Sequence, residues 1–204
     1  MQDYSKILQE AYNQFLLPLG GKKIPTPYRI NEYGKYQKIG PEFQGKSSPQ
    51  VLTKTASKLA KEQKFNLNRA KIEDIRNFLI KNELGIDCSG FAYRMIDALV
   101  KKVKGKPLTA FGLPHVGRTY LSTLVGKEFA KPVKNLSEAK PGDIIILDGT
   151  TRIKNRLFHG LIVLEHKNKV ITYAHSSKRE GIKIEKAINY KLPEKFGIYR
   201  LKML

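Results

Sequence analysis

The sequence predicts an α+β protein, because helical periodicity fills its first half and strand patterns fill its second half. Up to about residue 104, apolar residues recur at steps of three and four, which places them on one face of a helix. From residue 141 onward, β-branched runs and apolar–polar alternation predominate, and turn residues separate them. We therefore expect helices packed on a small antiparallel sheet.

Residues that commonly start or stop a helix bound the expected helices. Pro18 and the pair Gly20-Gly21 end the first apolar pattern, and Ser48 followed by Pro49 is typical of a helix start. Residues that follow the first helix, 21–47, show no sustained period and are expected to be irregular, with at most a short strand. The expected helices cover about 4–17, 49–61, 68–82 and 88–103, with a short one at about 119–125.

The expected strands follow one another closely near the end of the chain. The first is a continuous β-branched run that suits a buried strand, and a polar turn at 166–169 joins the second and third strands into a hairpin. The fourth alternates apolar and charged residues. The expected strands cover 144–147, 158–165, 170–175, 181–185 and 196–201.

Length and composition fit one core with an accessory segment. The chain has 204 residues, of which 41% are hydrophobic and 27% charged, enough to bury a substantial core. We expect residues 1–80 to form an N-terminal extension packed on a core of residues 81–204. No apolar run approaches the roughly 18 to 20 residues that span a bilayer. We expect a monomer without a transmembrane segment.

We expect no secretory signal in the first residues, since a basic flank, an apolar core and a cleavage site are all missing from Met1 to Leu8. Two localisations stay open: secreted or cell envelope, if a leader is absent from this form of the chain, and otherwise cytoplasmic. A single cysteine excludes an internal disulfide and leaves the redox compartment open.

The net charge of +20, from 38 Lys and Arg against 18 Asp and Glu, predicts attraction to polyanions. Nucleic acid, an anionic membrane surface and acidic cell-wall polymers or peptides all qualify. The basic residues are spread along the chain, and neither an Arg-rich tail nor an RNA-binding motif with interleaved aromatics is visible. We expect a solvated basic surface rather than a specific nucleic-acid site.

The cysteine lies where a turn becomes a helix. The first turn of a helix has unpaired N–H groups and a positive dipole end, and both favour a thiolate at Cys88. Asp87 or Ser89 is a suitable cap, and Gly90 lets another backbone or a substrate approach. The alternative is a buried structural cysteine.

A nucleophilic cysteine needs a base and a group that orients the base. His159 begins one strand of the expected hairpin and His175 ends the next, so the two rings should be adjacent. We expect His166 to be solvated in the turn and His115 to lie on the surface. Two hydrogen-bonded strand-end histidines, or a zinc site with Cys88, are the alternatives; zinc is disfavoured because no Cys-x-x-Cys or His-x-x-x-His pair occurs.

Four blocks occur in order along residues 85–177. They are Asp87-Cys88-Ser89-Gly90-Phe91, Pro141-Gly142-Asp143-Ile144, His159-Gly160-Leu161-Ile162-Val163 and Tyr173-Ala174-His175-Ser176-Ser177. In order and approximate spacing, these blocks resemble the NlpC/P60 cysteine peptidases. The resemblance implies a circularly rearranged papain-like fold in which the cysteine-bearing helix packs on a small antiparallel sheet.

The resemblance also implies a cofactor-free hydrolase that cleaves amide bonds in the stem peptides of bacterial peptidoglycan or in related acidic peptides. By position, Cys88 is the nucleophile, His159 is the general base and later the acid, and His175 orients that base. The positions of Asp87 and Ser89 contact the amino end of the substrate in some relatives, although helix capping explains both residues equally well.

One departure concerns the tyrosine that lies near the thiol in this family. Members commonly carry a Pro-Tyr-x-Trp-Gly-Gly-like stretch shortly before the cysteine, but this chain has no tryptophan. The nearest match is Pro27-Tyr28-Arg29, 60 positions before Cys88. Tyr28 is thus a candidate substrate-binding residue, with an ordinary packed tyrosine as the alternative. Two other functions stay open: a papain-like amidase or acyltransferase on a non-wall substrate, and a catalytically inactive basic protein that binds polyanions.

Overall fold

The computed structural model of the chain describes residues 3–29, 44–148, 159–192 and 195–204. Part of the expected irregular segment at 21–47 and the first residue of the expected strand at 158–165 lie outside these ranges. Within them, the fold is mixed α+β, with five α-helices, a two-stranded antiparallel sheet and a six-stranded antiparallel sheet. The expected α+β class is therefore confirmed.

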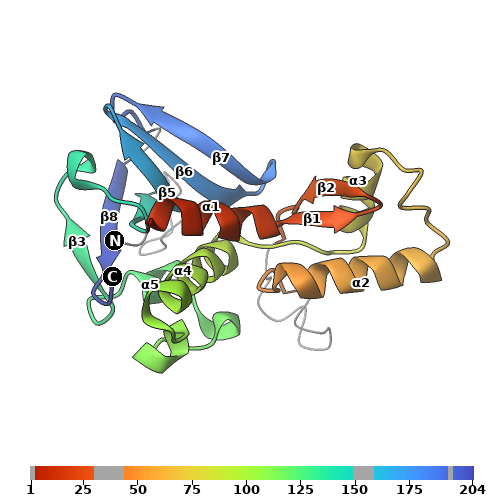
Figure 1. Cartoon of the computed structure of the whole chain (residues 1–204), viewed down its shortest axis with the longest axis horizontal. Helices are drawn as coiled ribbons and strands as arrows, with labels where there is room; N and C mark the ends of the chain where they lie inside the picture. The colour runs from red at the N-terminus through yellow and green to blue at the C-terminus, as the bar shows by residue number, and fades with distance from the viewer. Residues whose placement is uncertain (1–2, 30–43, 149–158, 193–194) are drawn as a thin grey trace.

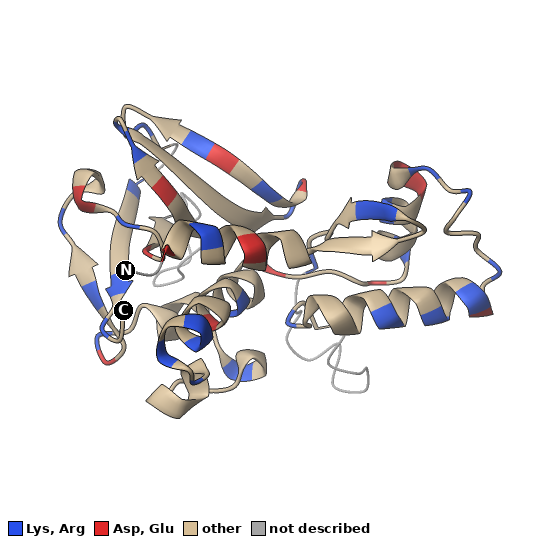
Figure 2. Ribbon diagram, in the orientation of Figure 1, with Lys and Arg blue, Asp and Glu red and all other residues tan. Residues whose placement is uncertain are grey.

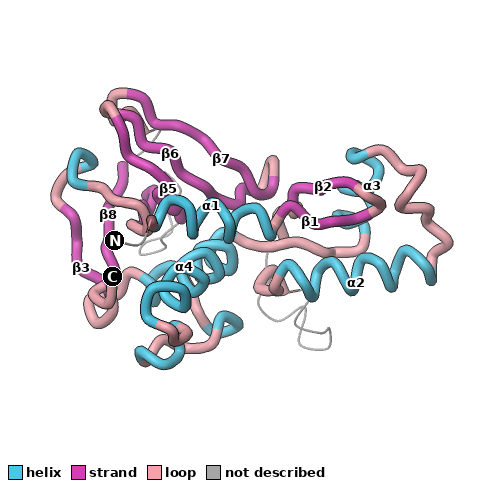
Figure 3. Tube along the Cα trace, viewed as in Figure 1, coloured by secondary structure: helices cyan, strands magenta, loops and turns pink. Residues whose placement is uncertain are grey.

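The six-stranded sheet is the larger layer, and the long helix α4 (Cys88–Lys104) lies against one of its faces (Figures 1 and 3). Its strand order is β3-β8-β4-β5-β6-β7, and all neighbours are antiparallel. The strands are β3 (Ala130–Val133), β4 (Ile144–Asp148), β5 (His159–Lys167), β6 (Val170–Ser177), β7 (Gly181–Ile188) and β8 (Lys195–Leu201). Five of them match expected strands.

Both faces of strand β4 are covered, which explains its continuous apolar run. Ile144 and Ile146 belong to the hydrophobic cluster that contains α4, whereas Ile145 and Leu147 belong to a second cluster on the opposite face. All four side chains are buried. The sheet is thus a middle layer, and its α4 side supports the helix that carries the cysteine.

Helix α1 (Tyr4–Gln14) packs on α4. The Phe15 ring, at the C-terminal cap of α1, lies 5.3 Å from the Phe91 ring of α4 in an edge arrangement. The helix ends earlier than expected, because residues 16–19 form strand β1 (Leu16–Leu19) and pair with β2 (Lys22–Pro25). Gly20 and Gly21 both have positive φ values, as a two-residue hairpin turn requires. The helical prediction for residues 16–17 was wrong because this turn gives them a strand partner.

The β1–β2 hairpin, α2 (Pro49–Glu62) and α3 (Ile72–Lys81) enclose a third hydrophobic cluster. Its buried members are Leu17, Leu19, Ile24, Leu52, Ala56, Ile75, Leu79 and Leu84. Figure 1 shows these elements at one end of the molecule and the six-stranded sheet at the other. The residues before about 80 therefore pack on the sheet module through α1 and build a separate core beyond it.

Three short helices connect α4 to strand β3 of the sheet, namely η2 (Leu108–Phe111), η3 (Val116–Arg118) and α5 (Leu121–Leu124), and a fourth, η4 (Leu136–Glu138), connects β3 to β4. Lys and Arg are spread over the helices and the strands alike (Figure 2). Among the described residues, no helix combines the length and the apolar character needed to cross a membrane.

Candidate active site

Helix α4 presents Cys88 as its first residue. Asp87 is the N-cap, and its Oδ1 accepts a hydrogen bond from the Gly90 N–H at 2.5 Å. On the sheet side, the Ser176 hydroxyl of β6 donates to the Ile86 carbonyl at 2.8 Å. These two bonds fix the start of α4 against the end of β6.

The sulfur of Cys88 lies beside the first residues of β5. Backbone N–H groups of Gly160 and Ser89 donate hydrogen bonds to it. The β5–β6 ladder begins only at the pair Ile162 and Ala174, so Gly160 is not paired with β6. Its N–H is therefore free of that ladder and available to the sulfur. Because Gly160 directly follows the first residue of β5, this contact brings the thiol to the strand start that carries a histidine.

Tyr28 folds back onto this point across 60 positions of sequence. It forms a parallel bridge with Ile86, whose N–H donates to the Pro27 carbonyl at 2.9 Å. The Tyr28 hydroxyl hydrogen-bonds to the Cys88 side chain. Burial, with further contributions from Cys88 and Asp87, raises the pKa of Tyr28, so its hydroxyl stays protonated. The backbone bridge, rather than proximity in sequence, brings the phenol to the thiol.

A buried lysine, Lys46, engages the cap of α4. Its Nζ donates to Asp87 Oδ1 at 2.9 Å and to Ser89 Oγ, and Ser89 Oγ donates to Asp87 Oδ1 at 3.0 Å. Lys46, Asp87 and Ser89 are 5%, 7% and 8% exposed. Asp87 and Ser89 are thus already engaged within the protein, and a substrate ammonium group would have to displace Lys46 to reach them.

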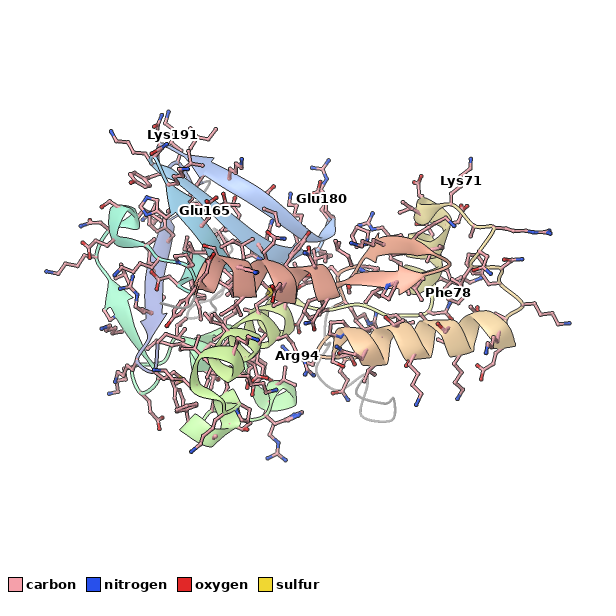
Figure 4. The ribbon with its side chains drawn as sticks, viewed as in Figure 1. Lys71, Phe78, Arg94, Glu165, Glu180 and Lys191 are labelled. Carbon is pink, nitrogen blue, oxygen red and sulfur yellow. The ribbon has the colours of Figure 1, made fainter. Side chains whose placement is uncertain are left out.

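The backbone around Lys46 is held across the first turns of α4. Asp87 N–H donates to the Gly45 carbonyl at 2.9 Å, and Arg94 Nη2 donates to the Lys46 carbonyl, also at 2.9 Å. Figure 4 shows Arg94 between α4 and α2. A Cβ at Gly90 would lie 2.4 Å from the Gly45 oxygen. The close approach expected at Gly90 is therefore made by backbone from the 44–47 segment, and it requires glycine.

The two strand-end histidines meet, as the hairpin predicts. His159 Nε2 and His175 Nδ1 are 2.5 Å apart, and the rings are edge to face with centroids 4.8 Å apart. His175 is buried. Because the Nε2 nitrogen of His159 is used in this contact, the Nδ1 nitrogen of His159 is the one that remains for another partner. The two nitrogens that meet share a proton, so they are not arranged to bind a common metal ion.

A carboxylate lies behind His175. Glu185 Oε2 is 3.1 Å from His175 Nε2 and accepts a hydrogen bond from the Tyr173 hydroxyl, also at 3.1 Å. Lys183 pairs with the other oxygen of Glu185 and with Glu180. Figure 4 shows Glu180 at the end of β7 nearest the β1–β2 hairpin. The histidine pair therefore continues into a row of charged groups on β7.

Burial controls the protonation of the thiol and of the imidazole. Burial, reinforced by Asp87, raises the pKa of Cys88 to about 11, although Lys46 and the Gly160 and Ser89 N–H groups oppose the shift. Burial, together with His175, lowers the pKa of His159 to about 4. The resting pair at pH 7 is therefore a neutral thiol and a neutral imidazole. This corrects the expectation of a thiolate, because desolvation outweighs the helix start.

The remaining histidines lie outside this cluster. His115 is exposed and accepts a hydrogen bond from its own turn, as expected for a surface residue. The prediction of a solvated His166 was wrong: its nitrogens lie 3.0 Å from the Ala139 carbonyl and from the Tyr190 hydroxyl, so it joins β5 to neighbouring loops. The described residues contain no group of three or more His, Cys, Asp or Glu side chains suited to a metal ion.

Two residues of the site, Lys46 and Glu185, were not predicted from the sequence. Lys46 could not have been predicted, because nothing in the 44–47 segment indicates burial. Glu185 could have been found, because it lies on the expected fourth strand, where hairpin pairing with β6 places it opposite Tyr173 and diagonal to His175.

Comparisons of the chain with family models, with curated proteins and with solved structures gave no significant match.

Proposed function

We propose that this chain is a thiol-dependent hydrolase with an NlpC/P60-like, papain-like site that cleaves amide bonds in bacterial cell-wall stem peptides. The observation that carries the proposal is the contact of His159 with His175 directly beside the strand position that donates its N–H to the Cys88 sulfur. The motif resemblance supplies the reaction class and the substrate class. The arrangement supports a nucleophile, a base and a group that orients the base.

The reaction starts from the neutral pair. His159 Nδ1 accepts the Cys88 proton as the sulfur attacks the substrate carbonyl, and backbone N–H groups at the start of α4 stabilise the oxyanion. The Tyr28 hydroxyl is a further donor next to this position. Collapse of the tetrahedral intermediate breaks the C–N bond, and the imidazolium of His159 returns the proton to the leaving amine. Water, deprotonated by His159, then attacks the thioester and releases the acid and the thiol.

Purified muropeptides incubated with the protein and examined by mass spectrometry test this function. We expect the wild type to cleave them and Cys88→Ala and His159→Gln to lower the rate on the order of 10^4-fold or more. His115→Gln, which changes an exposed histidine, should cleave like the wild type. Cleavage that survives Cys88→Ala would remove the thiol from the mechanism, and a folded wild type that cleaves no muropeptide would remove the substrate class.

The Lys46 contacts favour a second candidate, an amidase or acyltransferase whose substrate has no free amino end. Asp87 and Ser89 are occupied by an internal ammonium group, so a substrate amine is not needed to neutralise them. Stem peptides with a free or an acetylated amino end distinguish the candidates. Equal rates, or faster cleavage of the acetylated peptide, support the second candidate, and a strong preference for the free amine contradicts it.

A further inference from the structure

The β6–β7 register aligns polar side chains in one row. His175 pairs directly with Lys183, and Tyr173 pairs directly with Glu185. Opposed residues on antiparallel strands share a face of the sheet, so all four side chains are neighbours on one face. Glu185 is fixed in this row at both oxygens, by the Tyr173 hydroxyl and by Lys183.

The proton positions along the row follow from the chemistry of the carboxylate, which accepts hydrogen bonds and does not donate them. Facing Glu185 Oε2 at 3.1 Å, His175 Nε2 must carry a hydrogen. The other nitrogen of a neutral His175 is then bare, so Nδ1 accepts and His159 Nε2 donates across 2.5 Å. The Nδ1 nitrogen of a neutral His159 is consequently bare, which is the form that can take a proton from Cys88.

The premise that both rings are neutral holds near pH 7. Burial lowers the pKa of His159 to about 4, and burial also lowers the pKa of His175, against the opposing effect of Glu185. Lys183 lowers both values further. The lysine therefore offsets the negative charge of Glu185, which alone would favour a protonated His175 with hydrogens on both nitrogens.

The second nitrogen of His175 also needs an acceptor. His175 Nε2 is buried, and among the described residues it makes no well-aligned hydrogen bond. A buried N–H without a partner is costly. Glu185 Oε2, at an ion-pair distance of 3.1 Å, is an acceptor within reach of this N–H.

We propose that Glu185 is a positioning residue that acts through His175 to fix the tautomers of both histidines, so that His159 presents a bare Nδ1 to Cys88. The proposal rests on the proposed function and adds a fourth group to its site. Glu185 makes no contact with a reacting atom in this scheme. Glu185 instead determines which of the two nitrogens carries the hydrogen in the contact between His159 and His175.

Four variants separate positioning from general charge effects. Glu185→Val removes the acceptor and suits a strand. Glu185→Gln keeps an oxygen acceptor and removes the charge. Glu180→Gln is the matched control, because Glu180 also pairs with Lys183 but its charge makes the smallest of the contributions to the pKa of His175. Glu185→Leu is a second apolar replacement if the valine variant melts at a lower temperature.

Nitrogen-15 NMR of the histidine rings and the rate of Cys88 alkylation against pH provide readouts that need no substrate. We expect the wild type to hold His159 with its hydrogen on Nε2. Glu185→Val should mix the tautomers and slow alkylation at pH 7 on the order of tenfold, while Glu185→Gln and Glu180→Gln stay close to the wild type.

Unchanged tautomers and alkylation in a folded Glu185→Val or Glu185→Leu variant would overturn the proposal, as would an equal loss in Glu180→Gln. A failure of the proposed function looks different: the wild type would show the expected tautomer and the expected effect of Glu185→Val, yet cleave no cell-wall peptide.

Discussion

Two lysine–carboxylate pairs flank the candidate site, and they differ in burial. At the start of α4, the Lys46 and Asp87 side chains are 6% and 10% exposed, whereas on β7 the Lys183 and Glu185 side chains are 29% and 37% exposed. Water and salt screen the β7 pair, so it contributes little to stability. The buried pair is not screened, and removing one partner leaves an unpaired charge in the interior.

The comparison separates two roles that charges have around one thiol. Lys46 holds the cap of α4 and the 44–47 segment in place, so it belongs to the fold as much as to the site. Glu185 and Lys183 lie on a strand at the edge of the sheet, where they act on His175 through hydrogen bonding and charge. Variants of the first pair should change stability, and variants of the second should change protonation.

The largest effect on stability is expected from Lys46→Met. It leaves the Asp87 carboxylate buried without its cation, which costs about 3–5 kcal/mol of the free energy of unfolding. It also removes a charge that lowers the pKa of Cys88, so that pKa should rise further. Denaturant unfolding measures the first change, and Cys88 alkylation against pH measures the second.

Lys101→Met is the matched control for Lys46→Met. Lys101 Nζ lies 2.7 Å from Asp97 Oδ2, and Asp97 is also buried, but the Lys101 side chain is 54% exposed. Its loss should cost less than about 1 kcal/mol, because water replaces the ammonium group. Equal losses from the two variants would contradict the comparison between buried and exposed pairs.

The same contrast explains which parts of the site the sequence could predict. His159 and His175 were placed together correctly because a short turn joins their strands, and antiparallel pairing then follows locally. Cys88 was placed at a helix start by its own cap and by the periodicity after it. Lys46 reaches the site through contacts 41 and 43 positions away, which no local pattern encodes.

The elements of the fold were likewise predicted where a local pattern encodes them and missed where they depend on distant contacts. Helical periodicity predicted α2 and α4, and apolar runs or apolar–polar alternation between turn residues predicted five strands. Strand β3 was missed because Ala-Lys-Pro-Val carries no alternation, and its strand character comes from pairing with β8 at the sheet edge. Tyr28 was found only as a candidate, because its position depends on the bridge to Ile86 rather than on the residues around it.

An intermediate effect on stability is expected when the pH is lowered. His159 has a folded pKa of about 4 against an ordinary value of 6.5, so the unfolded chain binds its proton first. The stability that a neutral His159 contributes is fully present above pH 6.5 and is lost as the pH falls toward 4, by about 1–3 kcal/mol for this part-buried ring. The pKa of His175 is also lowered and adds to the loss.

Melting temperatures from pH 7 to pH 4 measure this loss in the wild type and in His159→Gln. The variant should lose less stability on acidification, because it has no imidazole to protonate at this position. His115→Gln, at an exposed site, should follow the wild type. A His159→Gln variant that loses as much stability as the wild type would show that acid acts elsewhere in the protein.

The smallest effect on stability is expected from Lys183→Met, below about 1 kcal/mol, because the pair it breaks is exposed. The protonation of His159 and His175 should nevertheless change. Lys183 lowers the pKa values of His159 and His175, so its removal raises both, and Cys88 should lose reactivity at a higher pH on acidification. Lys186→Met removes the same charge from an exposed position on the same strand and should leave that pH unchanged. Two results would contradict this role of the β7 charges. One is a loss of stability in Lys183→Met as large as that in Lys46→Met, and the other is an unchanged pH at which Cys88 alkylation slows on acidification.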